Sequence, residues 1–172
     1  MKKILIIYTG GTIGMHHDSS GALKPFDFGK VSEQVPELNR LGCKLSHHGF
    51  SELIDSSNVA PDFWVKLAET IQKNYTKYDG FVILHGTDTM AYSASALSFM
   101  LENLSKPVIF TGSQLPLGAI RTDAKRNLIS SIEIAAGKVL IPEVCIYFNN
   151  QLFRGNRAEK FTSSMFDAFQ SL

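Results

Sequence analysis

The 172-residue sequence is poor in cysteine, in net charge and in long apolar runs. Its two cysteines, Cys43 and Cys145, are far apart and lack metal-ligand spacing, so we expect free buried thiols in a reducing cytoplasm. A formal net charge of +1 excludes nucleic-acid or membrane-surface binding that rests on bulk electrostatics. No stretch approaches the roughly 20 apolar residues that span a bilayer. We therefore expect a cytoplasmic protein with neither nucleic-acid nor membrane partners.

The apolar fraction, 44%, is that of an ordinary globular protein and suffices for one domain with a sizeable core. Short runs rich in Ile and Val predict buried parallel strands at Lys3–Tyr8, Gly80–Leu84, Pro107–Phe110 and Glu143–Phe148. Apolar residues at helical spacing predict helices at Pro61–Tyr75, Asp88–Leu101 and Asp123–Ala136. This alternation predicts an α/β fold with a parallel sheet and right-handed crossovers.

Two of the predicted strands end in loops that combine glycine with threonine, TGGTIG at Thr9–Gly14 and HGTDTM at His85–Met90. Ligands of open α/β sheets bind beyond the carboxyl ends of the strands, so these loops predict a functional site. The first loop matches no phosphate-binding motif and no helical pattern follows it, which disfavours a phosphate ligand. Two local alternatives stay open, because the Thr12 hydroxyl could satisfy backbone groups and Asp88 could cap the following helix.

A hydroxyl group becomes a strong nucleophile when a nearby group accepts its proton. Two threonines, an aspartate and a lysine can form such a relay, and the candidate lysine is Lys160 in RGNRAEK. On composition alone Lys160 cannot be distinguished from Lys125 or Lys138, so a solvated surface lysine remains the alternative.

Four segments together resemble bacterial-type L-asparaginases, and most closely their cytoplasmic type I branch. They are TGGTIG at 9–14, GFVILHGTDTMAYSASALSFML at 80–101, KPVIFTGSQLP at 106–116 and FNNQLFRGNRAEK at 148–160. The resemblance covers essentially the whole chain. It implies a flavodoxin-like parallel sheet flanked by helices, with residues 1–172 forming an N-terminal asparaginase domain and the family's smaller C-terminal domain absent. It also implies hydrolysis of L-asparagine by a homodimer or homotetramer, without metal or cofactor.

The resemblance assigns roles to individual residues. Thr12 matches the nucleophile that attacks the side-chain amide, while Thr87, Asp88 and Lys160 match the proton relay. Ser56 and Ser57 match residues that hold the α-carboxylate, and Asp88 also matches the group that holds the α-ammonium. Ser113 matches a residue whose backbone faces the leaving amide, and an oxyanion site is expected at the amides of Thr12 and Ser113. The implied substrate-binding set is Gly11, Ser56, Ser57, Gly86, Thr87, Asp88 and Ser113.

The sequence departs from the family in the expected flap, residues 13–28. Many members carry a flap tyrosine that activates the first threonine, whereas this segment holds Phe26 and Phe28 and no tyrosine. Activation of Thr12 is then expected from water, from Thr87 and Lys160, or from a residue elsewhere. His85, directly before the second Gly-Thr loop, is expected to orient that loop.

Two other functions are compatible with these motifs. The amidase subunit of a tRNA-dependent amidotransferase shares the loops, but we expect an additional N-terminal region there, and this sequence begins at the first strand. A non-catalytic amino-acid-binding domain is the other alternative, suggested by the missing tyrosine and the missing second domain.

Overall fold

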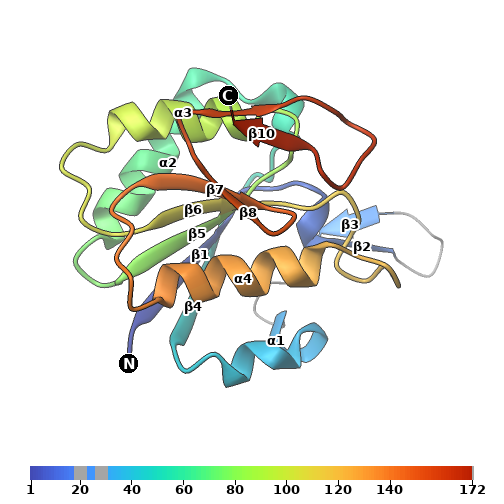
Figure 1. Ribbon diagram of the computed structural model, residues 1–172, viewed down its shortest axis with the longest axis horizontal. Coiled ribbons are helices and arrows are strands. Elements are labelled where there is room, and N and C mark those ends of the chain that lie inside the picture. The colour runs from blue at the N-terminus through green and yellow to red at the C-terminus, as the bar shows by residue number, and fades with distance from the viewer. Residues whose placement is uncertain (18–22, 26–30, 172) are drawn as a thin grey trace.

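The computed structural model describes residues 1–17, 23–25 and 31–171, and its centre is a six-stranded sheet (Figure 1). The strand order is β4-β1-β5-β6-β7-β8. Five of these strands are parallel, and β8 runs antiparallel to β7. The strands are β1 (Lys3–Tyr8), β4 (Lys44–Gly49), β5 (Gly80–Leu84), β6 (Val108–Thr111), β7 (Val144–Phe148) and β8 (Gln151–Arg154).

Helices cover both faces of the sheet. Figure 1 shows α2 (Pro61–Asn74) and α3 (Met90–Met100) on one face, with α4 (Ala124–Ala136) and the short α1 (Val31–Gln34) on the other. Two small antiparallel pairs lie outside the main sheet, β2–β3 and β9–β10. The remaining elements are β2 (Met15–His17), β3 (Leu23–Pro25), β9 (Ala158–Lys160), β10 (Phe169–Ser171) and the 3-10 helices η1 (Thr12–Gly14), η3 (Pro36–Arg40) and η4 (Ser56–Asn58).

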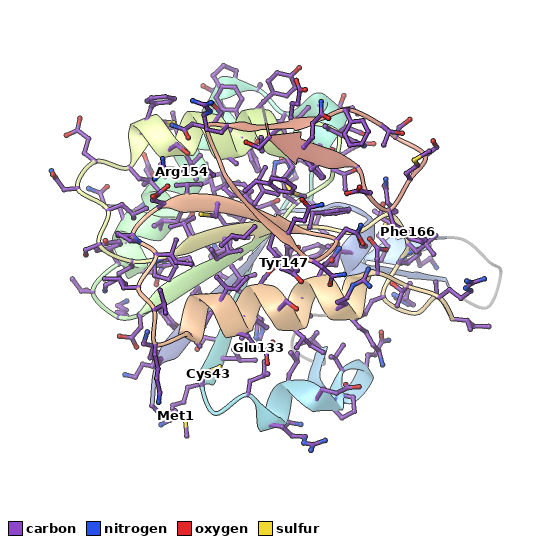
Figure 2. All side chains as sticks on the ribbon, in the orientation of Figure 1. Met1, Cys43, Glu133, Tyr147, Arg154 and Phe166 are labelled. Atoms are coloured by element: carbon purple, nitrogen blue, oxygen red, sulfur yellow. The ribbon has the colours of Figure 1, made fainter. Side chains whose placement is uncertain are left out.

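The central strands are apolar on both sides because each side faces its own core. In β1, Leu5 and Ile7 pack toward α2 and α3, whereas Ile4 and Ile6 pack toward α4 and α1. Figure 2 shows Tyr147 of β7 on the α4 side of the sheet, in agreement with its place in that core. This burial on two faces explains why the strands appear in the sequence as continuous apolar runs.

The four predicted strands and three predicted helices are confirmed, with ends that move by one or two residues. The order β4-β1-β5-β6-β7 is the 2-1-3-4-5 order of flavodoxin-like folds. The sheet is nevertheless mixed, because β8 returns antiparallel through a tight turn at Asn149 and Asn150. Both asparagines have positive φ angles, 45° and 66°, as a type I′ hairpin turn requires.

Both cysteines are free thiols, but only one is buried as expected. Cys145 lies inside β7, whereas Cys43 is only half-buried where the chain enters β4. Among the residues that the structure describes, no helix combines the length and the apolar character needed to cross a bilayer.

Candidate active site

Strand register brings the two Gly-Thr loops to one edge of the sheet. Tyr8, the last residue of β1, pairs with Leu84, the last residue of β5, and Leu84 pairs with Thr111 of β6. The loops that carry Thr12 and Thr87 therefore start at the same level, at the point where the strand order reverses. This is the position at which flavodoxin-like sheets bind ligands.

A cavity of about 280 Å³ lies between these loops and the segment that follows β4. A larger hollow of about 550 Å³ lies between α2 and the end of α3, away from the strand ends. The smaller cavity is the candidate site, because it alone of the two gathers the polar groups of the Gly-Thr loops. Its lining is Gly10, Gly11, Thr12, Met15, Leu53, Ile54, Asp55, Ser56, Gly86, Thr87 and Asp88.

Glycines allow the backbones around this cavity to approach one another. A Cβ atom on Gly11 would lie 2.5 Å from the backbone nitrogen of Gly86, and one on Gly10 would lie 2.2 Å from the carbonyl oxygen of Ile54. Gly11 also has a φ angle of +86°, which favours glycine. The close partner of the first loop is thus the backbone of its neighbours.

The Gly11→Ala substitution is expected to destabilise the fold more than the same change at Gly42. Gly42 also has a positive φ (+63°), but nothing lies within 4 Å of a Cβ built there. Gly42→Ala therefore introduces only the backbone strain, whereas Gly11→Ala adds steric overlap with Gly86. Urea unfolding should show a further loss of about 2 kcal/mol for Gly11→Ala. Equal losses for the two variants would show that the close packing of the loops contributes nothing.

The structure joins three of the predicted relay residues by hydrogen bonds. Lys160 lies on β9, and its Nζ donates to Thr87 Oγ1 at 2.8 Å and to Asp88 Oδ1 at 2.7 Å. The Lys160 side chain is 12% exposed and that of Asp88 is 60% exposed. Lys160 is therefore a shielded cation that faces the second loop, and its interpretation as a solvated surface lysine is wrong.

Thr12 lines the same cavity as Thr87 and Asp88, and it begins η1. The alternative in which Asp88 caps the following helix is wrong. The N-cap of α3 is Thr89, and the Thr89 side chain makes no capping bond but donates to the carbonyl oxygen of Ser56 at 2.7 Å. The Asp88 carboxylate is thereby left to Lys160 and to the cavity.

The predicted substrate-binding serines occupy different environments. Ser56 is buried and lines the cavity. Ser57 is exposed and outside the lining, and both its backbone nitrogen and its hydroxyl donate to Asp55 Oδ1, at 3.0 and 2.9 Å. These two bonds lower the pKa of Asp55. Ser113 is buried and also outside the lining, and its hydroxyl donates to the carbonyl oxygen of Leu115 at 2.6 Å.

A buried polar network fixes the loop after β6, which carries Ser113. The Asp123 carboxylate accepts the backbone N–H groups of Gln114 and Leu115 at 2.9 and 3.0 Å. The fully buried Asn127 side chain donates to the carbonyl oxygen of Gly112 at 2.9 Å. A Cβ on Gly112 would lie 3.5 Å from Thr87, so the third loop supports the second.

His85 is buried at the start of the second loop. Its Nδ1 lies 2.7 Å from the carbonyl oxygen of Gly86, and its Nε2 lies 3.0 Å from the hydroxyl of Ser93. Burial lowers the pKa of His85 from 6.5 to about 4. The imidazole is therefore neutral at pH 7.

Protonation of His85 predicts an acid-sensitive contribution to stability. Between pH 6.5 and 4 the unfolded chain binds a proton at His85 and the folded chain does not, so the free energy of unfolding falls as the pH drops. The loss should reach about 3 kcal/mol at pH 4 and be absent above pH 6.5. Urea unfolding at several pH values should show a shallower slope in this window for His85→Gln. His47→Gln, at an exposed histidine of β4, should keep the wild-type slope.

Several lining residues have no counterpart among the sequence predictions. Leu53 and Ile54 form an apolar wall after β4, and no sequence signal marked them because β4 itself was not predicted. Asp55 could have been found, since an aspartate before Ser56 and Ser57 is a common start of a tight turn. Gly10 could have been found as part of a glycine pair directly after a buried strand.

The predicted flap, residues 13–28, is described in part. Met15 of β2 lines the cavity, while residues 18–22 and the phenylalanines at 26 and 28 lie outside the described residues. No group of three or more histidine, cysteine, aspartate or glutamate side chains within the described ranges is arranged to hold a metal ion.

Comparison with known proteins agrees with this arrangement. The family model described as Asparaginase, N-terminal matches residues 3–172. The chain belongs to the asparaginase family. It is 50% identical to L-asparaginase 1 of Escherichia coli K12, over 99% of this chain and 51% of that protein. The crystal structure of L-asparaginase I from Vibrio cholerae superposes with a TM-score of 0.90 at 49% identity, over 99% of this chain and 51% of that one.

A more distant asparaginase-family relative belongs to the glutamyl-tRNA(Gln) amidotransferase of Pyrococcus abyssi. That protein is 37% identical over the whole of this chain and 41% of its own length. The chain thus spans about half the length of the curated asparaginases that it matches.

Proposed function

We propose that residues 1–172 form the N-terminal domain of an L-asparaginase, which converts L-asparagine and water to L-aspartate and ammonia. The observation that carries the proposal is the contact of Lys160 with Thr87 and Asp88 at the wall of a cavity that Thr12 also lines. In this reaction Thr12 Oγ1 attacks the side-chain carbonyl carbon, and a β-aspartyl ester forms as the C–N bond breaks. Water then attacks the ester and releases aspartate.

The proton balance explains why a hydroxyl–lysine pair suits this site. Acylation releases one proton at Thr12 Oγ1 and needs one at the leaving nitrogen, so a single relay between these two atoms is sufficient. Lys160 donates to Thr87 Oγ1, which leaves the Thr87 hydroxyl proton free for a group in the cavity. Thr87 can thus protonate the departing amine while Lys160 replaces the proton. In deacylation the attacking water supplies a proton that returns to Thr12.

The charges of the cavity wall suit an α-amino acid. Asp88 is paired through one oxygen and half open to solvent, so its second oxygen can accept from an α-ammonium group. Ser56 lies in the opposite segment and can donate to an α-carboxylate. The predicted contributions of Ser57 and Ser113 require their backbone groups, because both hydroxyls are already engaged within the protein.

The cytoplasm is the proposed location, since both cysteines are free thiols, the state that a reducing compartment maintains. A homodimer or homotetramer is the proposed assembly. The described part of the flap, with Met15 at the cavity, is consistent with residues 13–28 covering the site.

The experiment is ammonia release by the protein as its gene encodes it, with asparagine and glutamine as separate substrates. Turnover of asparagine without any partner supports the proposal. Ammonia release that strictly requires a second protein and tRNA would replace it with the amidotransferase function. Calorimetric binding of asparagine or aspartate without turnover would replace it with an amino-acid-binding domain.

A further inference from the structure

We propose that His85 is a positioning residue for Thr87, set in one tautomer by a hydrogen-bond chain that starts at Trp64 of α2 and passes through Ser93 of α3. The kinetic part of this inference rests on the proposed function. The chain itself is a statement about the structure alone.

The chemistry of its ends fixes the direction of the chain. The indole N–H of Trp64 can only donate, and it lies 2.9 Å from Ser93 Oγ. The carbonyl oxygen of Gly86 can only accept, so the hydrogen of the neutral His85 ring lies on Nδ1. Nε2 is then an acceptor, and the Ser93 hydroxyl donates to it at 3.0 Å. Each hydrogen bond thus has one possible donor, and all of them point from Trp64 toward Gly86.

The surroundings of His85 favour this single arrangement. The ring is 1% exposed and Ser93 is fully buried. Phe63 and Phe110 pack against the imidazole, with ring centroids 5.5 and 5.8 Å away in edge-on geometry. These aromatic rings restrict rotation of the imidazole and keep water from replacing its partners, so a broken link would leave buried polar groups unpaired.

The end of the chain controls the peptide that carries Thr87. Because a peptide unit is planar, fixing the Gly86 carbonyl oxygen also fixes the direction of the Thr87 N–H group. Gly86 is confined from the other side as well, since a Cβ there would lie 2.4 Å from Ser56 Oγ. The two constraints together set the loop that presents Thr87 to the cavity and to Lys160.

The test compares Ser93→Ala with Ser98→Ala in the protein as its gene encodes it. Both serines lie on α3, but Ser98 donates only within its own helix, to the carbonyl oxygen of Ala94 at 2.7 Å. We expect Ser93→Ala to lower kcat by about ten- to a hundred-fold, with KM within about threefold of wild type, because the misplaced group acts on the reacting atoms. Ser98→Ala should keep both constants.

Nuclear magnetic resonance of protein labelled with ¹⁵N at histidine and tryptophan supplies a readout that does not depend on turnover. Trp64 is the single tryptophan of the 172 residues, and Trp64→Phe assigns its indole signal. The wild type should show His85 protonated on Nδ1 and a slowly exchanging indole proton. Titration with aspartate should shift that indole signal in the wild type and in Ser98→Ala, but not in Ser93→Ala.

Each result decides a separate point. A wild-type His85 protonated on Nε2 would overturn the chain, and equal kcat values for folded Ser93→Ala and Ser98→Ala would overturn the positioning role. If Ser93→Ala does not fold, Trp64→Phe removes the first donor and is expected to lower kcat by about tenfold; an unchanged kcat would overturn the role in its place. A wild type that turns over no amide would refute the proposed function, while the His85 tautomer and the aspartate titration still decide this inference.

Discussion

Replacing Thr12 with alanine is expected to lower kcat for ammonia release from asparagine by about 10⁴-fold, because the substitution removes the proposed nucleophile and with it the ester intermediate. KM should change little, since the groups proposed to hold the α-ammonium and α-carboxylate, Asp88 and Ser56, remain in the cavity wall. Steady-state ammonia release, followed over a range of asparagine concentrations, measures both constants.

The matched variant is Thr12→Ser, which keeps the hydroxyl and loses the methyl group that restricts χ1. It should retain far more activity than Thr12→Ala. Thr70→Ala serves as the control for a threonine outside the site, because Thr70 is exposed on α2 and donates to the carbonyl oxygen of Lys66. Equal rates for wild type and Thr12→Ala would remove Thr12 from the mechanism.

Replacing Lys160 with methionine is expected to lower kcat by about 10²- to 10⁴-fold. Methionine keeps an unbranched apolar side chain but removes the cation that contacts Thr87 and Asp88. The Thr87 hydroxyl then has no donor to restore its proton, and the Asp88 carboxylate loses its counterion. The measurement is again kcat for ammonia release, together with the unfolding midpoint in urea.

Lys73→Met is the control for loss of a lysine–carboxylate pair as such. Lys73 contacts Glu69 at 3.0 Å on the surface of α2, with 72% and 54% of the two side chains exposed. Such a surface pair contributes at most about 1 kcal/mol, and its loss should leave kcat unchanged. If Lys160→Met has as little effect as Lys73→Met, the relay does not operate.

The central sheet could be predicted because its strands are buried on both faces and therefore appear as uninterrupted apolar runs. The edge strand β4 could not, since its sequence, KLSHHG, is largely exposed and carries one strongly apolar residue, Leu45. Its absence from the prediction also hid the apolar wall at Leu53 and Ile54, which depends on where β4 ends.

The candidate site was partly predictable for a similar reason. Thr12 and Thr87 follow buried strands directly, so sheet topology alone brings their loops together. Lys160 enters from the β9–β10 hairpin, which packs against α3 and has no strong apolar pattern of its own. Only the family resemblance distinguished Lys160 from other lysines, and the His85–Ser93 contact depended on helix packing that no local pattern encodes.

The bond between Lys160 and Thr87 joins positions 73 residues apart, and this separation has a consequence during synthesis on the ribosome. At roughly 5–20 residues per second, about 4 to 15 s pass between translation of the two residues. During that interval a nascent chain already carries Thr12 and Thr87 but not the cation that serves them. Translation products that stop before β9 should therefore be inert toward the cell's asparagine, however well their earlier strands have folded.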